Sequence, residues 1–157
     1  MARSMLGSWL DGPKATLEQQ GIDFGYPGQR LGLPESGPGR VATFNRRLVA
    51  LVIDWFSALA ISNALANTDV LDDRQVSLAT LGIFAAQVAL FTMLMGASFG
   101  QRVLGIGVRQ ITGQPVNVVV ALIRTLLLCL VIPAVIWDRD GRGLHDKIGK
   151  SVVVHTR

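Results

Sequence analysis

Residues 46–66 read RRLVALVIDWFSALAISNALA, and they decide the fold because the stretch from Leu48 to Ala66 is mostly apolar and carries one formal charge, Asp54. At 1.5 Å per residue, about 20 apolar residues in a helix cover the roughly 30 Å of a bilayer's hydrocarbon core. A second block, residues 76–95, carries no charge, and a short, acid-rich connector separates it from the first. We therefore predict a hairpin of two transmembrane helices, 48–66 and 76–95.

The third apolar block, residues 116–137, contains Arg124 and has Pro133 near its far end. A tail over residues 138–157 follows it and carries five Lys or Arg residues. By its length the block could cross the bilayer and leave the tail outside, whereas a basic tail favours the cytoplasmic side. We expect the tail to lie inside and the block to be kinked or re-entrant.

Orientation follows from the side on which the basic residues collect. Arg40, Arg46, Arg47, Arg102 and Arg109 all fall on one side of the predicted hairpin, and the acid-rich connector falls on the other. Since cytoplasmic loops carry an excess of Lys and Arg, we expect a multi-pass membrane protein with a cytoplasmic N-terminus.

The composition of the 157 residues excludes several classes of protein. Half of the residues are hydrophobic and 17% are charged, which is too apolar for a disordered chain. The lone Cys129 excludes an internal disulfide. The net charge of +4 fits an excess of basic residues on the cytoplasmic face, and no basic run with interleaved aromatic residues points to nucleic acid.

Residues 1–42 precede the membrane domain, which we place at residues 43–157, and they are rich in glycine and proline. We expect an irregular cytoplasmic arm, which is either a flexible tail or a segment that lies on a partner protein or on the membrane surface. In the second case Trp9, Phe24 and Tyr26 are the expected contacts.

The expected fold class is an all-α membrane protein, a small helical bundle with short strand-like pieces at the interface. Residues 108–112 alternate between apolar and polar side chains before Gly113, which is typical of a short strand.

Asp54 needs compensation, because a carboxylate near the middle of a spanning helix costs roughly 2.5–3.5 kcal/mol on insertion scales. Arg124 lies at a similar depth if the first and third blocks both enter from the cytoplasmic face. We predict a buried pair of Asp54 and Arg124. The alternative is that Arg124 extends to the lipid headgroups and that Asp54 is protonated.

At the inner interface, Arg47 could meet Asp146 if the tail is cytoplasmic, and the two would form a polar seam under the bundle. The alternative is that both are ordinary interfacial charges. His145 and His155 lack further ligands at metal-binding spacing, and no nucleophile or phosphate-binding motif is present. We therefore expect no metal, no cofactor and no enzymatic activity.

Four short stretches of this sequence resemble the RDD family of small bacterial integral membrane proteins, named for one arginine and two aspartates. The resemblance rests on residues 46–54, 100–108, 121–124 and 144–154, and the arm is similar to those of actinobacterial members. It implies that the family's arginine is Arg47 and that its two aspartates are Asp54 and Asp146. The family's molecular role is not established, although transport has been suggested for it.

Two functions remain open. The first is an accessory or assembly subunit of a larger membrane complex, which would contact other integral membrane proteins and anionic lipid headgroups through its helices and arm. The alternative is a cation or proton transporter with Asp54 as the titrating carboxylate. Three segments cannot easily enclose a pathway, so a transporter would have to be a homo-oligomer.

Overall fold

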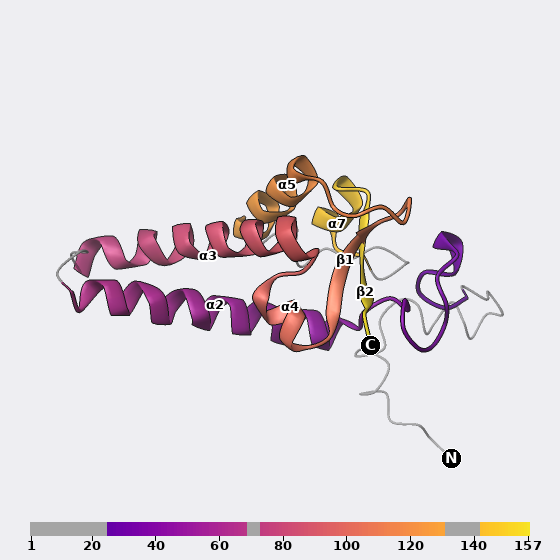
Figure 1. The fold of residues 1–157 in the computed structure, drawn as a ribbon, viewed down its shortest axis with the longest axis horizontal. Coiled ribbons are helices and arrows are strands. Elements are labelled where there is room, and N and C mark those ends of the chain that lie inside the picture. The colour runs from indigo at the N-terminus through magenta and orange to yellow at the C-terminus, as the bar shows by residue number, and fades with distance from the viewer. Residues whose placement is uncertain (1–24, 69–72, 131–141) are drawn as a thin grey trace, which may run out of the picture.

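The computed structural model describes residues 25–68, 73–130 and 142–157, and it is mostly helical (Figure 1). The elements are the helical turn η1 (Gln29–Leu31), the helices α2 (Phe44–Ala66), α3 (Asp73–Met95), α4 (Phe99–Val103), α5 (Val118–Cys129) and α7 (Leu144–Ile148), and the strands β1 (Ile106–Gln110) and β2 (Ser151–His155). Figure 1 shows α2 and α3 as a long antiparallel pair, with the shorter elements gathered around one end. We call α4, β1, α5, α7 and β2 the head.

Each helix of the α2–α3 pair buries one narrow stripe of side chains. The buried residues of α2 recur every three or four positions, and those of α3 do the same, as a helical face requires. These residues are Arg47, Ala50, Asp54, Ala58 and Ser62 on α2, and Thr80, Phe84, Val88 and Thr92 among those on α3. Small side chains let the two backbones approach, and a hydrogen bond of 2.6 Å joins the hydroxyls of Ser62 and Thr80.

Within the described residues, α2 and α3 are the two helices that are long and apolar enough to span a membrane. They end at Ala66 and Met95, where the predicted spans end. They begin at Phe44 and Asp73, a few residues before the predicted starts at 48 and 76. The difference arises because the apolar block marks the part suited to lipid, whereas the helix continues through polar residues such as Arg47.

The fold is mostly helical, as expected, and the head contains a small antiparallel sheet in place of separate strand-like pieces. Strand β1 pairs with β2 from Ile106 opposite His155 to Gln110 opposite Ser151. Val41, just before α2, adds a single bridge to Val154 on the other edge of β2. The predicted strand at 108–112 therefore lies two residues too far along the chain.

The sheet also places the C-terminal strand relative to the hairpin. Val41 precedes α2 and β1 follows α3, and β2 pairs with both. Residues 151–155 therefore lie at the same end of the hairpin as Val41, as expected if the tail and the arm are on one side of the membrane.

The described part of the third apolar block contains the short helix α5, whose 12 residues extend about 18 Å, less than a 30 Å hydrocarbon core. The next described helix, α7, contacts α5 and β2. The predicted kink near Pro133 lies outside the described residues.

Part of the arm covers the sheet. Leu31 and Leu33 pack against Val41, Val152 and Val154, which form one apolar cluster on that face. On the other face, Val153 packs with core residues of the membrane domain. Among the contacts expected of the arm, Tyr26 is half-buried, and Trp9 and Phe24 lie outside the described residues.

Candidate functional site

A buried carboxylate, Asp146, joins α2 to α5 and α7 of the head. It lies on α7 and has no solvent exposure. Its Oδ2 atom accepts a hydrogen bond of 3.1 Å from Nη1 of Arg47 on α2, and its Oδ1 atom accepts one from Nη1 of Arg124 on α5. The same Nη1 of Arg124 donates to the hydroxyl of Ser151 at 2.7 Å. We call Arg47, Arg124 and Asp146 the charge cluster.

The charge cluster also favours the ionised form of Asp146. Burial raises the pKa of Asp146, but the positive groups of Arg124, His145 and Arg47 outweigh it and hold the pKa below its ordinary value of 3.8. The Nε2 atom of His145 lies 3.5 Å from Oδ1. Asp146 is therefore ionised at neutral pH.

Arg47 connects the charge cluster to the backbone at the base of the hairpin. Its Nε donates to the carbonyl oxygen of Ala42 at 3.1 Å, and its Nη2 donates to that of Val153 at 3.2 Å. One side chain thereby ties α2 to β2 and to the chain that precedes α2.

Asp54 has a separate set of partners. Its Oδ2 atom accepts a hydrogen bond from the hydroxyl of Ser98, and its Oδ1 atom accepts one of 2.7 Å from the backbone N–H of Gly100. A capping box orients this turn, because Gln101 and Ser98 each bond the other's backbone N–H. Gly100 is needed here, since a Cβ at this position would overlap the carbonyl oxygen of Ala50.

The structure brings Arg47 and Asp146 together, but it does not form the expected pair of Asp54 and Arg124. In the described part of the chain, the ion pairs of Arg124 run to Asp146 alone. The expectation was wrong because α4 folds back onto α2 and supplies Asp54 with neutral donors. Arg124 does not extend to solvent either, since it is only 3% exposed.

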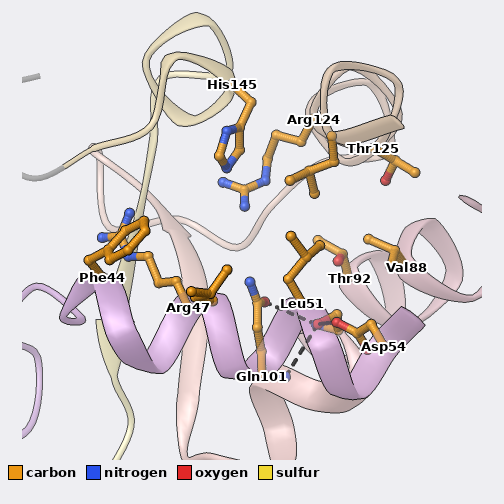
Figure 2. Close-up of a pocket in the computed structure, with 13 residues that line it drawn as sticks. Phe44, Arg47, Leu51, Asp54, Val88, Thr92, Gln101, Arg124, Thr125 and His145 are labelled. Atoms are coloured by element: carbon orange, nitrogen blue, oxygen red, sulfur yellow. Dashed lines mark hydrogen bonds between the residues drawn. The ribbon is translucent and has the colours of Figure 1, made fainter. Parts of the chain in front are cut away.

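A cavity of about 240 Å³ lies between the charge cluster and Asp54 (Figure 2). Figure 2 shows His145 and Arg124 on one side of it, with Gln101 and Asp54 opposite. Its lining is Phe44, Arg47, Leu48, Leu51, Asp54, Val88, Thr92, Ser98, Gln101, Arg124, Thr125, Leu128 and His145. The cavity lining thus combines the guanidinium groups of Arg47 and Arg124, the carboxylate of Asp54 and several apolar side chains.

His155 lies at the edge of the sheet and is 3% exposed. Its Nδ1 atom lies 3.3 Å from Nη1 of Arg46, which can only donate, so the ring proton belongs on Nε2. That Nε2 is buried without a hydrogen-bond partner among the described residues. Burial, together with the charges of Arg40, Arg46 and Arg47, lowers the pKa of His155 below 6.5.

The described ranges contain no group of three His, Cys, Asp or Glu residues that could hold a metal ion. Sequence reasoning missed Ser98, Gly100 and Ser151 as polar partners of the buried charges. The first had a signal, because a serine followed three residues later by Gln101 is the pattern of a capping box. The other two depend on how distant segments meet.

Comparison with known protein families matches a region that includes the buried charges. No curated protein and no solved structure matches the chain. The model of the RDD family matches residues 41–150, which is more than half of the chain and includes Arg47, Asp54 and Asp146. With two candidate membrane-spanning helices and these buried charges, the chain belongs to the RDD family.

Proposed function

We propose that this RDD-family protein is a non-enzymatic accessory or assembly subunit of a larger membrane complex and binds its partner laterally through α2 and α3. The observation that carries the proposal is that the buried charges are engaged within the protein. Arg47 and Arg124 share Asp146, and Asp54 is bonded to α4. This arrangement holds the head closed on the hairpin and supports a binding role.

The outer faces of α2 and α3 support lateral contacts. Less than a third of the most apolar window of each helix is buried within the protein. The exposed large apolar side chains include Val52, Phe56 and Ile61 on α2 and Leu78, Leu90 and Leu94 on α3. In a membrane such faces contact either lipid or another helix, and a subunit would use one of them for its partner.

Site-specific photocrosslinking tests this proposal in native membranes. A photoreactive phenylalanine analogue is placed at Phe56, which is 63% exposed, and at other exposed positions around the two helices. We expect a discrete protein adduct from one face and none from the opposite face. Mild solubilisation should then recover the same protein in fixed stoichiometry. Recovery of free protein, with lipid adducts at every position, would contradict the proposal.

A second candidate, an oligomeric cation or proton transporter, is favoured by the position of Asp54 beside the cavity. Further polar groups extend from it along the hairpin, because Gln87 Nε2 donates to the carbonyl oxygen of Asp54 at 2.6 Å and to Ser57 Oγ at 2.8 Å. In this case Asp54 would be the titrating carboxylate, and several copies would enclose the pathway.

Flux measurements in proteoliposomes separate the two functions. A transporter should move cations or protons in a way that Asp54→Asn abolishes, whereas Thr80→Val, deeper in the hairpin and matched in size, should retain flux. An Asp54→Asn protein that transports normally would contradict the role of this carboxylate. A wild-type protein without flux leaves the accessory role as the function to pursue.

We also place the head on the cytoplasmic side of a bacterial plasma membrane. Support comes from Arg40, Arg46, Arg47, Arg102 and Arg109, which all lie at the head end of the hairpin. Basic residues near the ends of spans favour the cytoplasmic side.

A further inference from the structure

Two guanidinium groups, those of Arg47 and Arg124, line the cavity beside the charge cluster. Among the described residues, both share the single carboxylate of Asp146. The acid that lines the cavity, Asp54, lies on the opposite side from Arg124, and its oxygens are engaged by Ser98 and Gly100.

Arg124 has hydrogen-bond donors to spare. Both of its hydrogen bonds in the described residues are made by Nη1, so Nε and Nη2 donate none. Among the described side chains, His155 Nε2 is the one fully buried polar atom without a hydrogen-bond partner. Nε and Nη2 of Arg124, which also lack a partner, are therefore not fully buried, and they are open to the cavity that Arg124 lines. An unpaired donor on a side chain this buried is costly, which favours a ligand.

The free donors have the geometry that recognises an oxyanion. The N–H groups of Nε and Nη2 form one edge of the planar guanidinium, and such an edge binds two oxygens of a phosphate or carboxylate in parallel. His145 lies beside the guanidinium of Arg124, as Figure 2 shows. A lysine would present a point charge in place of the fork.

Apolar side chains line much of the rest of the cavity. They include Leu51, Val88 and Leu128, and also Phe44 and Leu48. The last two are 50% and 45% exposed on α2. A ligand therefore has room for an anionic group inside and an apolar chain that leaves past these two side chains.

The depth of the cavity matches the lipid headgroup region. Arg47 lies three residues into α2 from Phe44, which is about 5 Å along the helix, and Asp54 lies about 15 Å along. The volume of about 240 Å³ approaches the lower end of the roughly 300–1,000 Å³ of ligand pockets. The charged groups therefore lie where a bilayer offers phosphate groups.

We propose that this cavity binds one phospholipid with an anionic headgroup, its phosphate held by Nε and Nη2 of Arg124 and its chain leaving along Leu48 and Leu51. The site does not depend on which lateral partner the protein has. A protein that does not bind the lipid could therefore still be an accessory subunit.

Native mass spectrometry of the full chain in a neutral maltoside detergent tests the site. The probes are phosphatidylglycerol, phosphatidylcholine with identical chains, and inorganic phosphate. We expect one phosphatidylglycerol per chain, bound at least about tenfold tighter than phosphatidylcholine, and no measurable phosphate at the same concentration. Equal binding of both lipids would overturn the proposal, and so would phosphate binding as strong as that of phosphatidylglycerol, which would indicate a free-anion site.

Two variants locate the binding. Arg124→Lys keeps the charge and loses the fork, so binding of phosphatidylglycerol should weaken by about tenfold, the loss expected for a hydrogen bond to a charged group. Arg109→Lys, on the exposed side of β1, is the matched control and should bind as the wild type does. Wild-type binding by a folded Arg124→Lys protein would overturn the proposal.

If Arg124→Lys does not fold, a substitution at an apolar lining residue tests whether the lipid binds in the cavity. Leu51→Phe fills the cavity without touching the charge cluster and should weaken binding, whereas Val49→Phe, on an exposed part of the same helix, should not. Equal binding by these two phenylalanine variants would overturn the site.

Discussion

The Asp146 carboxylate has no contact with solvent and faces guanidinium groups from two helices. Removing water from all three charges is costly, and their mutual attraction offsets that cost only while the carboxylate is present. The charge cluster is therefore less a source of net stability than a condition for closing the head. A change to one member should have a large effect because it leaves the others buried and uncompensated.

Asp146→Asn should lower the free energy of unfolding by about 3–5 kcal/mol, because Arg47 and Arg124 lose their shared counter-charge. Denaturant or thermal unfolding in detergent measures the change. Glu35→Gln, which removes a carboxylate from the exposed arm, should cost less than about 0.5 kcal/mol. A loss below about 1 kcal/mol for Asp146→Asn would contradict the importance of the charge cluster.

His155 should make the protein acid-sensitive in a defined range. In the unfolded chain its ring binds a proton near pH 6.5, whereas burial and the neighbouring arginines lower the pKa in the folded state. The unfolded state then binds more protons, so the free energy of unfolding falls as the pH drops below about 6.5. Asp146, whose folded pKa is lowered from 3.8, adds a further loss only at more acidic pH.

Unfolding between pH 5 and pH 7.5 measures this dependence. In His155→Gln the slope should become flatter, because the ring that resists protonation is gone. An unchanged slope would show that another group causes the acid sensitivity.

At the scale of elements, the docking of α4 on α2 depends on a glycine. Gly100→Ala places a methyl group against the carbonyl oxygen of Ala50 and should force α4 away from Asp54. We expect a loss of about 1–3 kcal/mol, as in other overpacked contacts. Gly82→Ala in α3 is the control, since a Cβ there meets nothing within 4 Å and alanine favours the helix by up to about 1 kcal/mol. Equal effects of the two substitutions would contradict this docking.

An engineered disulfide between residues 41 and 154 tests whether Val41 pairs with β2. Hydrogen bonds from Ala42 N to Val153 O and from His155 N to Arg40 O flank the bridge, so the two valines form a close, non-hydrogen-bonded pair. Cysteines at 41 and 154 should form a disulfide in a Cys129→Ala background. Cysteines at 41 and 153 should not, because successive side chains of a strand point to opposite faces. The mobility of the oxidised protein on a denaturing gel gives the result.

The elements also differ in how far the sequence predicts them. Long apolar blocks indicate α2 and α3 directly, and their ends at Ala66 and Met95 could be predicted because Gly96 and the polar connector follow. The partner of Asp54 could not, because a five-residue helix and a backbone N–H carry no hydrophobic pattern. Alternating side chains indicate β1 to within two residues, but its pairing with β2 was beyond reach, since the two strands lie more than forty residues apart.

At the scale of the whole molecule, the pairing of β2 with Val41 and β1 fixes the relative sides of the chain. Ser36 and Thr156 lie at the head end, and Thr68 lies at the far end of the hairpin. Single cysteines at these exposed positions, in a Cys129→Ala background, can be labelled with a membrane-impermeant thiol reagent.

In spheroplasts, the cysteine at 68 should react, and those at 36 and 156 should react only after the membrane is permeabilised. Labelling of 36 and 156 on opposite sides would contradict the fold. Labelling of both from outside would keep the fold and reverse the proposed orientation.

The long sequence distance inside the charge cluster has a consequence for biosynthesis. A ribosome adds residues in order, and Asp146 is made 99 residues after Arg47, its partner across the base of the hairpin. While the nascent chain is being inserted, both arginines are without this counter-ion, so the hairpin must form before the head can close. Translation that pauses ahead of residue 146 would prolong an intermediate with an open base, which is the species that quality-control proteases of the membrane would encounter.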